Sequence, residues 1–309
     1  MTAHDFGPLS SRVPITVYGN DLGLGGVTDI SAALRFMDRG RVETIEAMCA
    51  DASQVSWLSR YMVNVYRLDA VFHRGARVGD HLVAETGLHQ HSSHRAAFDQ
   101  RIADAATGVV IADATVEVTF VDTQGQLAAV PEELEQQLAG SDLEDLVPAT
   151  LKFTPARKLT APPFSRRFKV YYEDTDTQSI AYHATYVRFC ERALQDLLEE
   201  CCSMPPFWRW LDDHRPRVTK LAARYTRPAR LGDDLEVRLW VREASDQEAL
   251  VELRLAMNPG ADETITTHLL LGVAFESVDG EPTPVPAEVR AMALAESRGH
   301  VSNGQPQRP

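Results

Sequence analysis

The stretch VYYEDTDTQSIAYHATYVRFCER, residues 170–192, decides the fold of this 309-residue chain. A short apolar strand enters a turn that holds three acids, Glu173, Asp174 and Asp176. A histidine, His183, then stands at the start of an amphipathic helix. The N–H groups and the positive dipole end of a helix N-terminus can stabilise an oxyanion, and a carboxylate can supply a nucleophile or a base. The stretch therefore indicates chemistry on a carbonyl group.

The chain contains a second, degraded copy of this stretch, 153 residues earlier. Two separated blocks of residues match in the same order at this one offset, each residue of the first copy with one of the second. The pairs are Val17/Val170, Tyr18/Tyr171, Asp21/Asp174, Arg35/Arg188, Phe36/Phe189 and Arg39/Arg192, then Arg74/Arg227, Ala76/Ala229, Arg77/Arg230, Gly79/Gly232, Asp80/Asp233 and Leu82/Leu235. Near the ends, VPEEL (130–134) matches VPAEV (285–289) at an offset of 155. Matches in one order at nearly one offset predict tandem copies.

Each copy predicts the same order of elements, and the fold class is α+β. A strand (about 12–18 and 166–172) precedes a turn, a helix (about 29–48 and 183–201) follows, and three or four strands come next. In the second copy these strands are expected at about 217–226, 234–243, 247–257 and 264–277, because LEVRLWVRE and LVELRLAM alternate with period two. Each copy would be an antiparallel sheet wrapped around a central helix. Two copies pairing edge to edge would cover their open sheet edges. We expect domains at 1–139 and 164–290, a linker at 140–163 and a disordered tail at 291–309.

Composition excludes several classes of protein. The formal net charge of −13 argues against broad binding to nucleic acid or to an anionic membrane. No apolar run approaches the roughly 18–20 residues that span a bilayer. The first residues lack the order of a signal peptide, which favours a cytoplasmic protein. The four cysteines have no framework or metal spacing, so we expect buried reduced thiols. The histidines of HQHSSH (89–94) have no apparent acid or cysteine partner, so no metal site is predicted.

The motifs of the second copy resemble those of a known family. VYYEDTD…YHATYVRFCERA, followed by RYTRPARLGDDLEV, resembles the 4-hydroxybenzoyl-CoA thioesterase-like branch of the hotdog-fold acyl-CoA thioesterases, over roughly residues 164–289. The resemblance implies a tandem (double) hotdog that hydrolyses an acyl-CoA to a carboxylic acid and CoA, with no metal or other cofactor. Two alternative functions stay open: a thioesterase for acyl carrier protein, and a non-catalytic acyl-CoA-binding or sensing module. The oligomeric state is open as well, since a monomer and a homodimer both fit. A hotdog dehydratase is less favoured, because no hydratase motif is present.

The resemblance also implies roles for individual residues. Asp176 matches the catalytic acid, which acts as nucleophile or as base. His183 matches the helix-start position whose backbone N–H polarises the thioester carbonyl, and its imidazole is expected to orient the acid or the water. The other expected substrate contacts are aromatic side chains and the cations of an acid-free strip, which would bind the CoA phosphates. They are Tyr182, Tyr186, Trp208, Lys220, Arg224, Arg227 and Arg230.

Departures from the family pattern occur in both copies, and one of them is Thr185 in place of the common Asn or Ser near the helix start. The turn glycine that usually follows the acid is replaced here by Thr177–Ser179. In the first copy Gly23 stands where Asp176 does and Ile30 where His183 does, so we expect that copy to be catalytically silent. Asp174 is expected to be structural, since Asp21 is kept in a copy that has lost the other two. For Asp176 itself, a residue that only caps the turn remains the competing interpretation.

Overall fold

The computed structural model describes most of the chain, in two compact units. The described residues are 6–7, 9–48, 60–138, 159, 161–176, 178–201, 206–259 and 263–297. The first unit comprises Met1–Lys152 together with His183–Val187 and Lys220–Thr226. The second comprises Phe153–Tyr182, Arg188–Thr219 and Arg227–Pro309. The first unit therefore includes two short pieces of the second copy. The expected linker, 140–163, lies outside the described residues except for 159 and 161–163.

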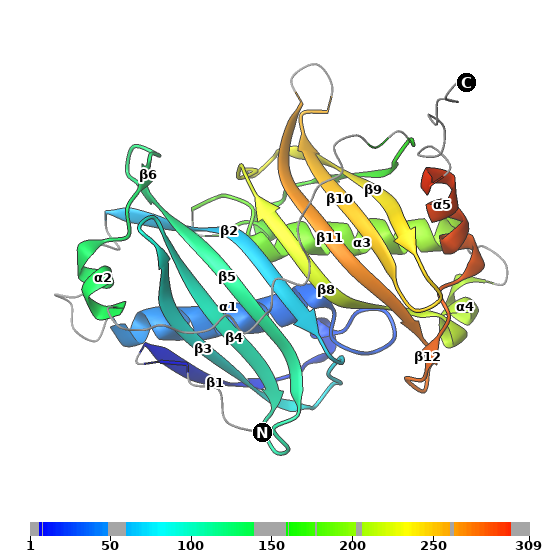
Figure 1. Ribbon diagram of the computed structural model, residues 1–309, viewed down its shortest axis with the longest axis horizontal. Helices are drawn as coiled ribbons and strands as arrows, with labels where there is room; N and C mark the ends of the chain where they lie inside the picture. Colours follow the sequence, from blue (N-terminus) through cyan, green and yellow to red (C-terminus); the bar gives the residue numbers. More distant parts are fainter. Residues whose placement is uncertain are drawn as a thin grey trace, which may run out of the picture. The chain divides into compact units, whose positions relative to one another are not determined.

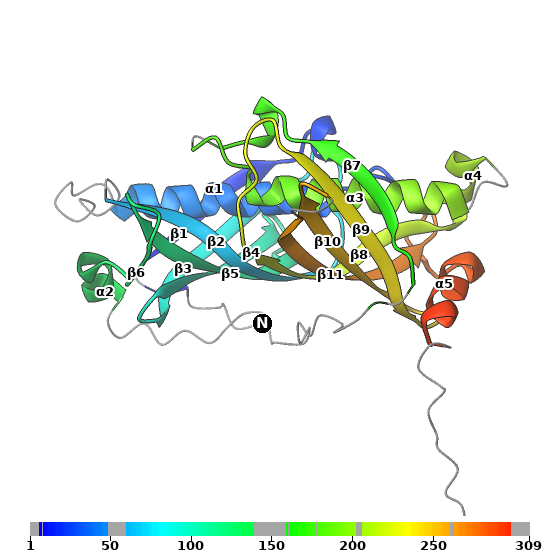
Figure 2. The ribbon, with the colours of Figure 1, turned by 90° about the horizontal axis from the view of Figure 1, so that it is seen from above.

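The first unit is an antiparallel sheet on a long helix, as predicted. Helix α1 (Ile30–Met48) packs against β1, β3 and β4, and Figures 1 and 2 show it along one face of the sheet. The strand order is β1-β3-β4-β5-β2, and each pair is antiparallel. The strands are β1 (Ser10–Thr16), β2 (Tyr61–Phe72), β3 (His81–Ser92), β4 (Arg95–Asp104), β5 (Val110–Asp122) and the short β6 (Leu127–Ala128). A 3-10 turn, η1 (Gly19–Asp21), precedes α1, and α2 (Glu132–Leu138) follows β6.

The second unit repeats this plan with α3 (His183–Cys201) as its helix. Its sheet runs β7-β9-β10-β11, again antiparallel. Phe168 on β7 stacks on Phe189 of α3 with ring centroids 5.0 Å apart, which fixes the helix on the sheet. The elements are β7 (Phe164–Lys169), η3 (Tyr172–Asp174), α4 (Phe207–Asp213), β8 (Arg215–Tyr225), β9 (Asp234–Ala244), β10 (Ala249–Met257), β11 (Thr264–Glu276), β12 (Pro282–Thr283) and α5 (Ala287–Ser297). The helix and strands predicted from the sequence are confirmed to within three residues at each end.

The end of β8 pairs with β2 inside the first unit. Lys220–Arg224 runs antiparallel to Arg67–Val71, and Asp69 lies opposite Ala222. These two residues are themselves counterparts at the 153-residue offset. The pairing is therefore symmetric about this pair, which confirms that an edge strand of one copy meets the equivalent strand of the other, as expected for sheet edges that would otherwise stay open.

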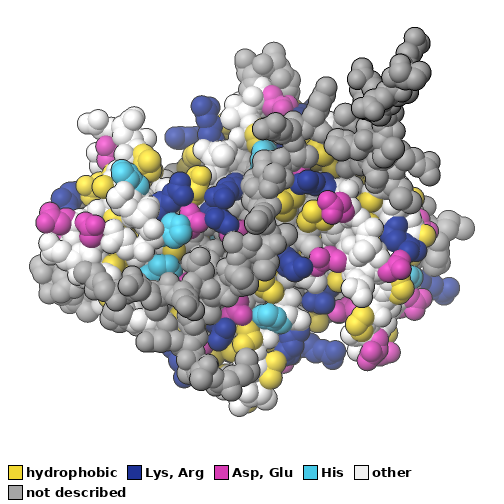
Figure 3. Space-filling model, viewed as in Figure 1, with side chains coloured by type: hydrophobic (Ala, Val, Ile, Leu, Met, Phe, Trp, Pro, Cys, Tyr) yellow, Lys and Arg dark blue, Asp and Glu magenta, His cyan; other side chains and the backbone are white. Residues whose placement is uncertain are grey.

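The helices bury their apolar stripes, and the opposite sheet face is polar. On α3 the stripe predicted from helical spacing is buried, including Phe189, Cys190 and Leu197. On the outer face of the strands, charges of both signs pair with one another, as Arg101 does with Asp113 and Arg254 with Glu252. Figure 3 shows cationic and acidic side chains interspersed on the visible part of that side.

Three further expectations can be compared with the described residues. The tail prediction is wrong at its start, because 291–297 belong to α5, where Ala293 is buried and Met292 contacts Cys201. The expected substrate contact Trp208 lies on a helix, because α4 begins at Phe207. None of the described helices combines the length and the apolar character needed to cross a membrane.

Candidate active site

The turn before each helix is held by a buried carboxylate. In the second copy Asp174 accepts the N–H of Tyr171 at 2.9 Å and pairs with Arg188 from α3. In the first copy Asp21 accepts the N–H of Tyr18 at 3.0 Å and pairs with Arg35 at 3.4 Å. Both aspartates are buried. The prediction that Asp174 is structural is confirmed, because the same clamp is built in the copy that lacks Asp176.

The backbone of the two turns also matches bond for bond. Asp176 N donates to Ile180 O at 2.9 Å, as Gly23 N does to Val27 O at 2.8 Å. The second block of matching residues, 74–82 in the first copy and 227–235 in the second, closes the turn from the other side. In each copy the residue two positions before the helix donates its N–H to a carbonyl oxygen of this block. These bonds are Ala181 N to Ala229 O and Thr28 N to Ala76 O, both 2.8 Å. The two blocks recur together in the sequence because they are hydrogen-bonded neighbours.

Asp176 sits inside this turn and is half-buried. Its Oδ1 accepts the N–H of Gln178 at 2.8 Å and that of Ile180 at 3.4 Å, which fixes the direction of the carboxyl group. Across the described part of the chain, Oδ2 of Asp176 forms no hydrogen bond or ion pair. The turn thus holds one carboxylate oxygen and leaves the other for a further partner.

The missing turn glycine has a backbone cost. Ser179 adopts φ of 60°, in the left-handed region that favours glycine. Its counterpart in the first copy is Gly26, with φ of 71°. The second copy therefore keeps the left-handed turn position of the first copy, with a strained serine in place of glycine. Thr177 lies outside the described residues.

The two helix starts differ in what occupies them. In the first copy Asp29 caps α1, because its Oδ1 accepts the N–H of Ala32 at 2.6 Å and the hydroxyl of Ser31 at 2.9 Å. Its counterpart in the second copy is Tyr182, and the first turn of α3 contains no acid. A carboxylate on the first helix start neutralises its dipole, whereas the second start keeps a positive end for an anionic ligand.

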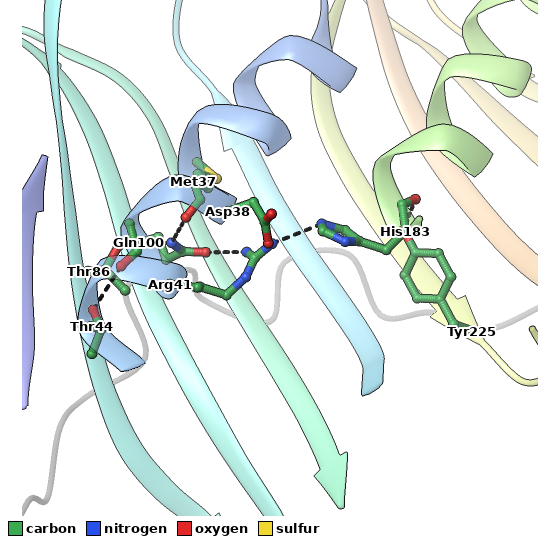
Figure 4. Close-up of polar contacts among 9 residues, drawn as sticks. Met37, Asp38, Arg41, Thr44, Thr86, Gln100, His183 and Tyr225 are labelled. Carbon is green, nitrogen blue, oxygen red and sulfur yellow. Dashed lines mark hydrogen bonds and ion pairs between the residues drawn. The ribbon is translucent and has the colours of Figure 1, made fainter. Parts of the chain in front are cut away.

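His183 is buried at the start of α3, and its ring faces a cation of the first copy. Nε2 lies 3.0 Å from Nη2 of Arg41 on α1 (Figure 4). A guanidinium can only donate, so Nε2 accepts and the ring proton resides on Nδ1. Burial first, and the Arg41 charge second, lower the pKa of His183 from 6.5 to about 3. The imidazole is therefore neutral at any ordinary pH. Its role in orienting the acid or the water stays a prediction.

The other predicted substrate contacts lie in varied environments. Tyr186 is buried, with its ring edge-on to Tyr225 at 5.8 Å. Tyr182 is half-buried, and its N–H donates to Asp174 O at 2.9 Å. Trp208 is exposed on α4, under the guanidinium of Arg209. Tyr186 thus belongs to the packed interior, whereas Trp208 faces solvent.

The predicted cations follow β8 and the turn after it. Lys220 and Arg224 are half-buried on β8, and Arg224 lies 5.6 Å over the ring of Tyr66. Arg227 and Arg230 are exposed. Arg230 forms a β-bridge with Ile180, which places it beside the turn of Asp176. Of the four cations, the structure brings Arg230 to the Asp176 turn.

Cysteines and histidines in the described part of the chain form no metal centre. No group of three His, Cys, Asp or Glu there could hold a metal ion. His89 of HQHSSH is buried beside Asp99, and Cys190 and Cys201 are free thiols. Burial raises the pKa of the Cys190 thiol well above its usual value, so it is inert. Cys49 and Cys202 lie outside the described residues.

Comparison with known proteins identifies the family. The model of the thioesterase superfamily matches residues 178–258, and that of the thioesterase-like superfamily matches residues 20–138. The acyl-CoA thioesterase YbgC of Haemophilus influenzae is 36% identical over 95 residues, which are 31% of this chain and 70% of that protein. This chain belongs to the thioesterase superfamily.

Two further comparisons show how much of the chain resembles known thioesterases. The acyl-CoA thioesterase YbgC of Helicobacter pylori is 34% identical over 77 residues, and this thioesterase-superfamily chain spans 55% of that relative's length. The structure of the 12:0-ACP thioesterase from Umbellularia californica superposes with a TM-score of 0.69 over 87% of this chain and 95% of that one, at 15% identity. At such identity the likeness shows the fold alone. Together these matches confirm the predicted tandem hotdog.

Sequence reasoning missed Arg41, Asp38 and Gln100 in this superfamily member. Two acids of α1, Glu43 and Glu46, are both exposed. A usable signal was present, since Arg41 falls on the buried stripe of its helix, where the second copy has Leu194. A charge on an apolar stripe implies a buried partner.

The strained turn predicts a stability difference between the copies. Ser179→Gly relieves the left-handed serine and should raise the free energy of unfolding by about 0.5–1 kcal/mol, whereas Gly26→Ser should lower it by a similar amount. Urea unfolding monitored by circular dichroism measures both. Equal, same-sign effects of the two substitutions would contradict the assigned turn geometry.

Burial of neutral His183 predicts an acid-sensitive fold. In the unfolded chain His183 binds a proton below about pH 6.5, but in the folded chain only below about 3. Between these values the unfolded state holds one more proton, so this residue lowers the free energy of unfolding by about 1.4 kcal/mol per unit fall in pH. Its contribution is complete above pH 6.5. His183→Gln should flatten the pH dependence of urea unfolding over this range, and His94→Gln, an exposed histidine, should not; equal slopes would refute the buried neutral ring.

Proposed function

We propose that this chain is a thioester hydrolase that converts an acyl-CoA into a carboxylic acid and free CoA. The observation that carries the proposal is the contrast between the two helix starts. The second copy pairs a turn carboxylate, Asp176, with a helix start that holds no acid, whereas the first copy has Gly23 and the capping carboxylate of Asp29. The names of the YbgC relatives support acyl-CoA as the substrate.

The proposed chemistry uses the turn and the helix start together. The N–H of His183, at the positive end of α3, donates to the thioester oxygen and stabilises the negative charge that forms there. Asp176 takes a proton from water, whose oxygen bonds to the carbonyl carbon, or attacks that carbon itself and forms an anhydride that water then cleaves. In both routes the carbon–sulfur bond breaks, and the thiolate leaves and takes up a proton. A thioester has a good leaving group, so one carboxylate and one donor suffice.

Substrate recognition is proposed to use the cations near the turn and the aromatic side chains. The exposed guanidinium groups of Arg227 and Arg230 are suited to the phosphates of CoA, as are Lys220 and Arg224 on β8. Tyr182 and Tyr186 would contact the acyl part, and Trp208 an exposed part of the ligand. No metal or other cofactor takes part in the proposed reaction. A cytoplasmic location and assembly into a homodimer are further parts of the proposal.

The central prediction concerns Asp176. Asp176→Asn removes the base or nucleophile and should lower kcat by at least about 100-fold, while the circular dichroism spectrum stays that of the wild type. The measurement is thiol release from a panel of acyl-CoAs, with Asp213→Asn, an exposed acid of α4, as the matched control. Thiol release by Asp176→Asn with the kcat of the wild type would refute the mechanism.

The same panel separates the other candidate functions. Tight binding of acyl-CoA without thiol release by the wild-type chain would favour the sensing module. Release from acylated carrier protein with little release from acyl-CoA would favour the carrier-protein thioesterase.

The silent first copy gives a second prediction. A Cβ atom at Gly23 would lie 2.8 Å from Cβ of Asp29, closer than such atoms approach in proteins. Gly23→Asp in the Asp176→Asn background should therefore fail to restore thiol release, and should lower the unfolding midpoint in urea. The double change Gly23→Asp and Asp29→Gly is the matched control, because glycine at position 29 has no Cβ atom and so relieves the clash. Recovery of turnover by Gly23→Asp alone would show that the first site is intact.

A further inference from the structure

The first copy contains a chain of buried polar side chains behind α1. Gln100 on β4 donates to Met37 O at 2.6 Å and to the hydroxyl of Thr86 at 2.9 Å, and accepts from Nη1 of Arg41 at 2.6 Å (Figure 4). Nη2 of Arg41 contacts Asp38 at 2.8 Å and His183 at 3.0 Å. Arg41 is only 4% exposed, and Thr86 and Gln100 are fully buried. The network begins inside the first copy and ends on the helix-start histidine of the second.

Most of the same positions in the second copy are apolar, and Asp38 is the exception, since its counterpart is Glu191. Adding 153 to each number gives the counterpart, and strand register supports the match, because Thr86 lies opposite Gln100 in one sheet and Leu239 opposite Leu253 in the other. The pairs are Ser11/Phe164, Arg41/Leu194, Thr44/Leu197, Thr86/Leu239 and Gln100/Leu253. All four leucines are buried. The fold itself is therefore satisfied by apolar residues here, and the polar set in the first copy needs another reason.

That reason is found at the end of the network. Burying a charge costs free energy unless it is paired, and an apolar replacement of similar size is often as stable. The partner of Arg41 across the copies is His183, and the counterparts of this pair are Leu194 and Ile30. Both members are polar at the helix start that keeps the catalytic acid, and both are apolar at the one that has lost it. The polar interior of the first copy thus contacts the helix start of the copy that has kept Asp176.

We propose that Arg41 is a positioning residue for the thioesterase site, so that the silent copy is required for turnover in the other. Its guanidinium donates to Nε2 of His183, which fixes the ring and keeps the ring proton on Nδ1. The carbonyl oxygen of His183 accepts the hydroxyl of Tyr225 at 3.2 Å, so the first residue of α3 is held at both its ring and its backbone. The donor N–H of that residue is then aimed without movement when charge develops. This inference rests on the proposed function.

Substitutions of Arg41 test the proposal. Arg41→Met removes the donors and should lower kcat by about tenfold to a hundredfold with a smaller change in KM, because the lost effect acts on the transition state. Arg41→Lys keeps the charge and an ammonium donor group, but not the planar fork of the guanidinium, and should recover part of this loss. Arg39→Met, at an exposed arginine of the same helix, is the control and should leave kcat unchanged. An unchanged kcat in folded Arg41→Met overturns the proposal.

A second readout does not depend on turnover. Nitrogen-15 NMR of the imidazole, assigned with His183→Gln, should show the Nδ1–H form in the wild type and a mixture of tautomers, with a higher pKa, in Arg41→Met. An identical imidazole spectrum overturns the proposal. If the imidazole spectrum differs between the wild type and Arg41→Met but the wild-type chain releases no thiol, the hydrolase function is refuted instead, so the two failures are distinguishable.

A third variant separates positioning from folding. Arg41→Leu, Thr86→Leu and Gln100→Leu together transplant the second copy's own residues into the first. The unfolding midpoint in urea should stay at or above that of the wild type, while kcat falls as in Arg41→Met. Wild-type kcat in this folded triple variant would overturn the proposal.

Discussion

The structure depends on one repeated constraint, a buried aspartate that ties the turn before each central helix to the helix itself. Asp21 and Asp174 each accept a backbone N–H at the turn entry and pair with an arginine one turn or more into the helix. The clamp fixes where the helix begins and where its positive end points. Any chemistry on that end depends on this geometry, so both copies kept it although their sites diverged.

The two copies share this turn but differ in where they place charged and apolar residues, both at the helix start and in the interior behind the helix. The first copy has a carboxylate cap at Asp29 and glycine at 23, but a polar interior behind α1. The second copy has Asp176 and an acid-free helix start, but an apolar interior at the matching positions. A homodimer would have to compromise between these demands at every position. A fused pair can build one site from complementary halves.

The sequence was sufficient for the fold and for the scaffold of the turn. The offset of 153 residues located both helices, and retention of Asp21 opposite Asp174 marked the clamp, because a position kept without the chemistry is structural. The left-handed Ser179 could be anticipated from Gly26. The Arg41–His183 contact could not, since the two residues lie 142 positions apart and a histidine at a helix start does not reveal its partner. Only the folded chain shows that the ring faces a cation.

We propose one working site per chain, at the start of α3. The most direct measurement is the stoichiometry of a non-hydrolysable acyl-CoA thioether, obtained by isothermal titration calorimetry with the wild-type chain. We expect one ligand per chain, with affinity weakened by loss of Arg230 next to the turn of Asp176. Two equivalent ligands per chain, or one ligand whose binding is insensitive to Arg230→Met but abolished by changes at the start of α1, would contradict it.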